Sequence, residues 1–188
     1  MLLAVARNPI EPRVYSDFGM KKKVCMLGSF GVGKTSLVQQ AVHSIYETNY
    51  HTTVGVKTDA KEMVCKGRAL KLILWDMAGE EPGAPVRINQ LRGAAGYFLV
   101  VDGLRKATLD VALSIQQRVK QEFGELPFLL LANKADERSQ WEIEDASWND
   151  LRQRGWTILE TSAKTGANVE EAFAQLAANM LEGEDGGQ

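Results

Sequence analysis

The chain has 188 residues, of which 45% are hydrophobic and 24% are charged, and its formal net charge is −2. This length and composition are ordinary for one globular domain with a sizeable core. The nearly balanced charge argues against a broad basic surface for nucleic acid, and no apolar run reaches the roughly 18 residues that a membrane-spanning helix needs. We therefore expect a cytoplasmic protein.

The first strand-like run, residues 23–27, begins well inside the chain. We expect residues 1–20 to form an extension and residues 21–182 to form the single domain. Cys25 lies in this first apolar run, and Cys65 lies in a later one. Cysteines inside apolar runs favour buried free thiols over a disulfide, which agrees with a reducing compartment.

A phosphate-binding motif follows this strand directly. Residues 28–35 read Gly-Ser-Phe-Gly-Val-Gly-Lys-Thr, the complete pattern G-x-x-x-x-G-K-[ST] between a strand-like and a helix-like run. The glycines allow a tight turn whose N–H groups point at phosphate oxygens, Lys34 supplies a charge for the β- and γ-phosphates, and the Thr35 hydroxyl can ligate Mg²⁺. The residues expected to surround the phosphates are Ser29, Phe30, Gly31, Val32 and Gly33. A glycine-rich turn that matches by chance is the alternative.

Strand-length apolar runs alternate with helix-length amphipathic segments along the rest of the chain. Predicted strands span residues 23–27, 58–65, 70–76, 96–102, 127–133 and 156–161, and predicted helices span residues 35–44, 86–93, 109–123, 142–154 and 169–181. A short link at residues 66–68 predicts that the two strands around it are antiparallel, whereas the others are expected to be parallel. This order predicts an α/β fold with helices on both faces of a mostly parallel six-stranded sheet.

Two polar tetrapeptides follow the last two predicted strands. Residues 133–136 read Asn-Lys-Ala-Asp, and residues 161–164 read Thr-Ser-Ala-Lys. Because open α/β sheets bind ligands at the carboxyl ends of their strands, both tetrapeptides are expected near the phosphate loop. An aspartate can accept two hydrogen bonds from guanine N1–H and the exocyclic amine, a pair of donors that adenine lacks. The combination predicts a guanine nucleotide site and disfavours an ATP-dependent kinase or ATPase.

Further segments carry a resemblance to a known family. Residues 75–80 read Trp-Asp-Met-Ala-Gly-Glu, and residues 92–96 read Arg-Gly-Ala-Ala-Gly. With the phosphate loop and the two tetrapeptides, they resemble the small GTPase superfamily, closest to its Ras and Rab branches, over residues 21–181. Residues 49–56 are similar to the first switch of Rab proteins. The resemblance implies the small G-protein variant of the P-loop NTPase fold, with GTP or GDP and Mg²⁺ as ligands.

The resemblance also implies a role for each matching residue. Thr53 would ligate Mg²⁺ only when a γ-phosphate is present, Asp76 would hold Mg²⁺ through water, and the Gly79 N–H would bond the γ-phosphate. Tyr46 falls where the family usually has an aromatic ring against the base, and a simple packing role is the alternative. The other nucleotide contacts would come from Ser36, Asn133, Lys134, Asp136, Ser162, Ala163 and Lys164. Hydrolysis would release Thr53 and Gly79, so both switch segments would relax and partners could read the difference.

The catalytic centre departs from the family at two positions. Glu80 stands where the family has its water-orienting glutamine; a carboxylate can only accept hydrogen bonds and brings negative charge near the phosphate, although it could act as a base. Phe30 stands where many Ras-like proteins have a small residue, and unless it points outward its ring would crowd Glu80 and an activator's arginine. Glu80, Lys34 and Gly79 are the catalytic candidates, and we expect slow intrinsic hydrolysis.

The second switch carries two prolines and a glycine at residues 81–85. Pro82 and Gly83 cannot sit in a helix interior, so we expect an irregular loop and a helix that begins near Pro85. The acidic, glycine-rich residues 183–188 are expected to be disordered, and they contain no cysteine for a prenyl anchor.

The sequence therefore predicts a GTP-binding switch that hydrolyses GTP slowly and signals through two nucleotide-sensitive segments. The alternative is a hydrolysis-deficient, GTP-bound module that acts only by binding partners. Expected partners are protein effectors, an activator and an exchange factor, with no nucleic acid, and with membrane association only through partners.

Overall fold

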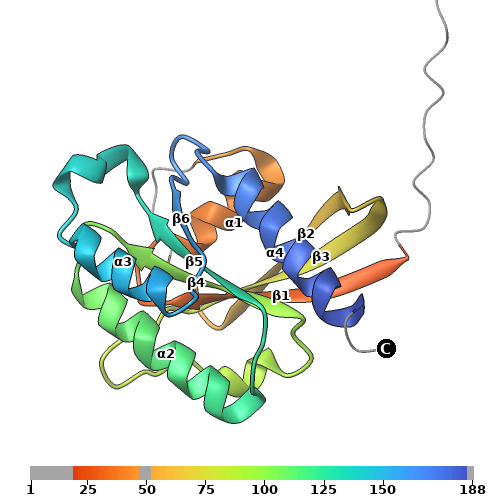
Figure 1. Cartoon of the computed structure of the whole chain (residues 1–188), viewed down its shortest axis with the longest axis horizontal. Coiled ribbons are helices and arrows are strands. Elements are labelled where there is room, and N and C mark those ends of the chain that lie inside the picture. The colour runs from red at the N-terminus through yellow and green to blue at the C-terminus, as the bar shows by residue number, and fades with distance from the viewer. Residues whose placement is uncertain (1–18, 47–51, 186–188) are drawn as a thin grey trace, which may run out of the picture.

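A computed structural model describes residues 19–46 and 52–185 of the chain (Figure 1). The strands among these residues form one six-stranded sheet in the order β2-β3-β1-β4-β5-β6. β2 and β3 are antiparallel, and all other neighbouring strands in this sheet are parallel. The predicted α/β fold, with a mostly parallel sheet and one antiparallel strand, is confirmed.

The elements follow one another in the predicted alternating order. The strands are β1 (Met20–Gly28), β2 (Val56–Cys65), β3 (Arg68–Met77), β4 (Gly96–Asp102), β5 (Phe128–Asn133) and β6 (Ile158–Thr161). The α-helices in the described ranges are α1 (Lys34–His43), α2 (Ala107–Phe123), α3 (Asp145–Gln153) and α4 (Val169–Asp185). Two 3-10 turns, η1 (Ile88–Leu91) and η2 (Ala135–Gln140), complete the set.

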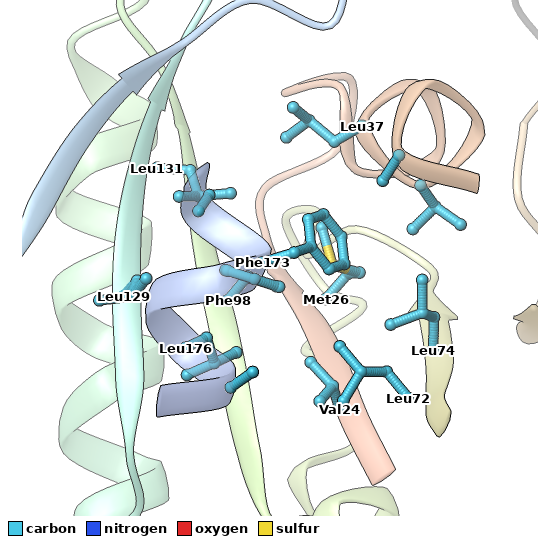
Figure 2. Close-up of a cluster of buried hydrophobic side chains, with 14 of the residues drawn as sticks. Val24, Met26, Leu37, Leu72, Leu74, Phe98, Leu129, Leu131, Phe173 and Leu176 are labelled. Carbon is cyan, nitrogen blue, oxygen red and sulfur yellow. The ribbon is translucent and has the colours of Figure 1, made fainter. Parts of the chain in front are cut away.

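The sheet is buried on both faces. Successive side chains of its central strands point in opposite directions, so each of these strands contributes to two cores. In β1, Val24 and Met26 join the core on the side of α1 and α4, and Cys25 and Leu27 join the core on the side of α2 and α3. Figure 1 shows the two pairs of helices on opposite faces of the sheet. Figure 2 shows the first of these cores, in which Phe173 of α4 packs on the sheet side chains.

The hairpin between β2 and β3 has a turn of two residues, Lys66 and Gly67. Cys65 pairs with Arg68 across the turn, and the φ angles of the two turn residues are 48° and 74°. Positive φ at both central positions is typical of a type I′ turn, whose twist matches that of the flanking strands. A turn of this type joins antiparallel strands, as the short link at residues 66–68 predicted.

The helix predicted over residues 86–93 is shorter than expected and of another type, because the structure forms only the four-residue 3-10 helix η1 there. Before it, Pro82 and Gly83 occupy the centre of a tight turn, closed by a bond of 2.9 Å from the Ala84 N–H to the Glu81 carbonyl. Gly83 has φ 80°, as the third residue of a type II turn after proline requires. The segment left before Gly93 is too short to offset the cost of helix nucleation.

The carboxyl end of the domain is more helical than predicted. α4 continues to Asp185, three residues into the segment 183–188 that we expected to be disordered. Extending an existing helix costs little, because each added residue gains a backbone hydrogen bond. Residues 1–18 of the predicted extension and residues 186–188 lie outside the described residues. Among the helices that the structure describes, none combines the length and the apolar character needed to cross a membrane.

Candidate functional site

The phosphate loop connects β1 to α1 and depends on glycine at two close approaches. A Cβ atom on Gly28 would lie 2.3 Å from the Val100 carbonyl oxygen, and one on Gly33 would lie 2.4 Å from Asn133 Nδ2. Both glycines also have positive φ, 142° and 97°. The loop therefore packs directly on the carboxyl ends of β4 and β5, at the edge where the other predicted site segments emerge.

Lys34 lies beneath this loop and is only 6% exposed. Its Nζ donates hydrogen bonds to the carbonyl oxygens of Gly28, at 3.3 Å, and Ser29, at 2.8 Å. Burial lowers the pKa of Lys34 to about 8, although the nearby Asp76 carboxylate opposes the shift. A buried cation with a lowered pKa is stabilised by any anion that binds in the loop.

The three residues predicted to bind metal lie together. Thr35 Oγ1 is 2.9 Å from Thr53 Oγ1 and donates a hydrogen bond of 2.5 Å to Asp76 Oδ2. Asp76 is 1% exposed, and its Oδ1 is buried without a hydrogen bond to the described residues. Burial raises the pKa of Asp76, although the hydrogen bond from Thr35 and the charge of Lys34 oppose the shift. Two hydroxyls and a carboxylate with one oxygen lacking a hydrogen bond among the described residues fit Mg²⁺, which takes oxygen ligands.

Two adjoining cavities collect most of the predicted nucleotide residues. The first is lined by Phe30, Gly31, Gly33, Lys34, Thr35, Ser36, Thr53, Met77 and Gly79. The second, of about 250 Å³, is lined by Gly31, Gly33, Ser36, Tyr46, Asn133, Lys134, Asp136, Glu137, Ala163 and Lys164. Because Gly31, Gly33 and Ser36 line both, the two cavities adjoin, and we consider them together as the candidate site. The predicted first-switch residues 49–51 lie outside the described residues.

Asn133 holds three loops of this site together. Its Nδ2 donates to the Val32 carbonyl at 2.9 Å, and its Oδ1 accepts from the Ala163 N–H at 3.2 Å. Asp136 accepts a bond of 2.6 Å from the Ser162 hydroxyl and lies 3.5 Å from Lys164 Nζ. Burial acts to raise the pKa of Asp136, but this hydrogen bond and the lysine charge outweigh it and lower the pKa. The carboxylate is therefore ionised near neutral pH and can accept hydrogen bonds from a ligand.

Besides Asp76 and Glu80, three residues predicted to bind the nucleotide line neither cavity of the site. The side chain of Val32 is fully buried in the core, and only its carbonyl takes part in the loop contacts. Ser162 contributes through its bond to Asp136. Ser29 borders a different cavity, of about 480 Å³, between the second switch and α2. These three residues therefore belong to loops of the site but do not line its cavities.

Of the three catalytic candidates, Lys34 and Gly79 line the phosphate side of the site, but the Glu80 carboxylate points elsewhere. Its Oε2 accepts hydrogen bonds from Arg118 of α2 and, at 3.0 Å, from the Val86 N–H. In this conformation Glu80 contacts the second switch and α2.

Sequence reasoning missed Asp102 and Arg105 as residues that brace the site. Asp102 is fully buried at the end of β4 and accepts from Lys134 Nζ at 2.7 Å and from Arg105 Nε at 2.8 Å. Arg105 Nη2 in turn donates to the Phe30 carbonyl at 2.9 Å. The available signal was a single carboxylate at the end of an otherwise apolar strand, which the sequence shows at residue 102.

The chain is similar in sequence to known proteins. The sequence model of the Ras family matches residues 23–182. The Ras-related protein Rab-32 of Mus musculus is 36% identical over 169 residues, which cover 85% of this chain and 75% of that protein. The chain therefore belongs to the Ras family of guanine nucleotide-binding small GTPases.

Proposed function

We propose that the protein is a molecular switch that binds GTP or GDP with Mg²⁺ and hydrolyses GTP slowly. One observation carries this proposal: the phosphate loop and the loops after β5 and β6 converge on two adjoining cavities and are joined by Asn133. A glycine-rich loop with a buried lysine, beside an ionised aspartate, is what a guanine nucleotide requires.

The base would lie in the larger cavity. Asp136 would accept from guanine N1–H and the exocyclic amine, the Lys134 stem would lie along the ring, and the Ala163 N–H would meet the guanine oxygen. Tyr46, which lines the same cavity, is the proposed aromatic neighbour of the base. The pKa lowering at Asp136 supports this assignment, because only the carboxylate can accept both hydrogen bonds.

The phosphates would lie in the smaller cavity, against the loop amides and Lys34. Thr35, Thr53 and, through water, Asp76 would hold Mg²⁺, whose charge would offset that of the phosphate oxygens. Because Thr53 and Gly79 belong to different segments that both border this cavity, loss of the γ-phosphate would release both. Effectors, an activator and an exchange factor would distinguish the two states.

In the reaction, water would attack the γ-phosphorus, and the bond from that phosphorus to the bridging oxygen of GDP would break. Lys34 and the Gly79 N–H would stabilise the charge on the phosphate oxygens. Two features support a low rate: the Glu80 carboxylate lies against Arg118, and Phe30 borders the phosphate cavity, where an activator's arginine would enter. Glu80 could act on the water only after its side chain turns.

The assignment of Asp136 is tested by Asp136→Asn. We expect GDP affinity to fall by about 100-fold or more and binding of xanthosine diphosphate to improve, because an amide presents a donor where the carboxylate presents an acceptor. Titration with fluorescent nucleotides measures both. Asp150→Asn, an exposed site on α3, is the matched control and should keep the guanine preference. Unchanged GDP binding by Asp136→Asn would contradict the base assignment.

The position of Glu80 also favours a second candidate, a GTP-bound module that does not hydrolyse its ligand. Single-turnover hydrolysis separates the two candidates. Measurable conversion of bound GTP supports the cycling switch, whereas persistent GTP in a correctly folded protein supports the module.

A further inference from the structure

Glu80 occupies the position at which the family orients water, yet two donors outside the phosphate cavity hold its carboxylate. The partners of its Oε2 are Arg118, eleven residues into α2, and the Val86 N–H. The Glu80 side chain is only 17% exposed. Hydrogen bonds to an ionised group are stronger than those between neutral groups, so these two bonds stabilise the observed position of the Glu80 carboxylate.

The main chain of Glu80 is fixed beside the phosphate loop. The Glu80 N–H donates to the Gly28 carbonyl at 3.1 Å, and the Phe30 N–H donates to the Glu80 carbonyl at 3.0 Å. Next to them, a Cβ atom on Gly79 would lie 2.4 Å from Phe30 Cα, so the backbones are in direct contact. With the backbone placed there, rotation about the Glu80 side-chain bonds decides whether the carboxylate lies near Arg118 or near the phosphate cavity.

Arg118 is suited to hold a carboxylate. Its side chain is 29% exposed, and its Nε is buried without a hydrogen bond to the described residues. A partly desolvated guanidinium interacts with an anion more strongly than an exposed one does. A glutamine at position 80 could accept one hydrogen bond from Arg118 but could not neutralise its charge. Arg118 therefore complements the glutamate that distinguishes this chain from the family.

The second switch and the first turns of α2 border a common cavity. A cavity of about 480 Å³ separates residues of the second switch, including Pro82 and Pro85, from the first turns of the helix, including Thr108 and Val111. Beyond the cavity, Val86 joins the buried core cluster that includes Ile115 of α2, so apolar packing and the polar contacts at Glu80 together hold the loop near α2.

We propose that Arg118 is a positioning residue that keeps the Glu80 carboxylate away from the γ-phosphate and thereby slows GTP hydrolysis. The proposal rests on the proposed function above. When Arg118 is absent, the carboxylate turns toward the phosphate cavity and accepts a hydrogen bond from the attacking water, which it orients for attack on the γ-phosphorus. The proton passes to the carboxylate or to phosphate, and the products are GDP and inorganic phosphate.

The test is single-turnover hydrolysis of GTP bound to the full chain with Mg²⁺. We expect Arg118→Met to raise the rate constant by about threefold or more, with GDP affinity unchanged within about twofold. In a Glu80→Ala background, Arg118→Met should have no effect, because the group that it releases is missing. Arg118→Lys keeps a cation and should stay close to the wild-type rate. Lys120→Met removes an exposed cation from the same helix and is the matched control.

Two results would overturn the proposal. One is an unchanged or lower rate in Arg118→Met, and the other is an equal increase in the Glu80→Ala background, which would indicate an effect of helix structure alone. If Arg118→Met does not fold, as judged by its melting curve, Arg118→Gln takes its place with the same expected results. Failure of the wild-type protein to bind GTP would instead contradict the proposed function, so the two failures are distinguishable.

Discussion

Asn133 is the side chain on which most of the site geometry depends. Its amide joins the phosphate loop to the two loops after β5 and β6, with hydrogen bonds of 2.9 Å to Val32 and 3.2 Å from Ala163. The absence of a Cβ atom on Gly33 allows this approach. In the proposed binding mode, base and phosphate contacts would be coupled through this one residue, and we expect a change there to weaken binding of both parts of the nucleotide.

Cys25 gives a prediction at the same scale. Burial raises its pKa from 9.0 to about 11, so only about one thiol in a thousand is ionised at about pH 8. We expect Cys25 to resist an aromatic disulfide reagent in the native protein and to react fully in guanidinium chloride. Cys65→Ala makes Cys25 the sole thiol, so a colorimetric assay can follow it. Rapid native labelling would contradict the buried position in β1.

The same shift predicts how stability depends on pH. Because the folded state raises the pKa, Cys25 favours folding below about pH 9, and this contribution is lost as the pH rises toward 11. The midpoint of chemical denaturation should therefore fall over this range, and it should fall less in Cys25→Ala.

Single residues also show what the sequence could and could not predict. Lys34, Thr35 and Asp136 stand inside local sequence motifs, so the sequence could single them out, and the structure brings them to two cavities that share lining residues. The motifs could not predict that Arg118 contacts Glu80 across 38 residues, since no local pattern encodes that pairing. Asp102 was missed for the same reason, as its partner Lys134 becomes a neighbour only when β4 and β5 pair.

At the scale of elements, Trp141 supports the loop that carries Asp136. Its indole N–H donates to the Lys134 carbonyl at 3.1 Å, and its ring lies on Gly103, where a Cβ atom would be 2.1 Å from Trp141 Cε2. Lys134 has φ 69°, an uncommon conformation for a residue with a side chain. The hydrogen bond from Trp141 helps to stabilise it.

Trp141→Phe should therefore speed GDP dissociation by about fivefold, the equivalent of one hydrogen bond of about 1 kcal/mol. Trp148→Phe is the matched control, because Trp148 is 1% exposed, packs against Trp141 and has an indole N–H without a hydrogen bond to the described residues. Stopped-flow displacement of a fluorescent GDP measures both. Equal dissociation rates for the two variants would contradict the role of the Trp141 hydrogen bond.

Element boundaries were predictable where periodicity was strong. The strand-like runs and the amphipathic pattern of α2 matched the structure closely, and the prolines correctly predicted an irregular second switch. At residues 86–93 the structure has a short 3-10 helix where a longer helix was expected. Apolar spacing alone does not reveal how few residues remain between the turn at Pro82 and Gly93. The 3-10 turn η2, which follows Lys134, was missed because its residues carry no apolar period.

At the scale of the whole molecule, the sheet brings distant motifs to one edge. β1, β4, β5 and β6 are neighbours and parallel, so their carboxyl ends present the phosphate loop, Asp102, Asn133 and the loop after Thr161 side by side. The alternation of strands and helices predicted this architecture, because parallel strands require crossovers. The strand order itself was not available from periodicity and came only with the structure.

The central claim is that this arrangement is a GTP-binding switch with slow hydrolysis. The most direct test loads the full chain with GTP and Mg²⁺ and follows the bound nucleotide by chromatography in a single turnover. We predict one guanine nucleotide per chain, converted to GDP with a rate constant on the order of 10⁻⁴ per second or slower. A chain that retains no guanine nucleotide, or one that converts it within seconds without an activator, would contradict the account.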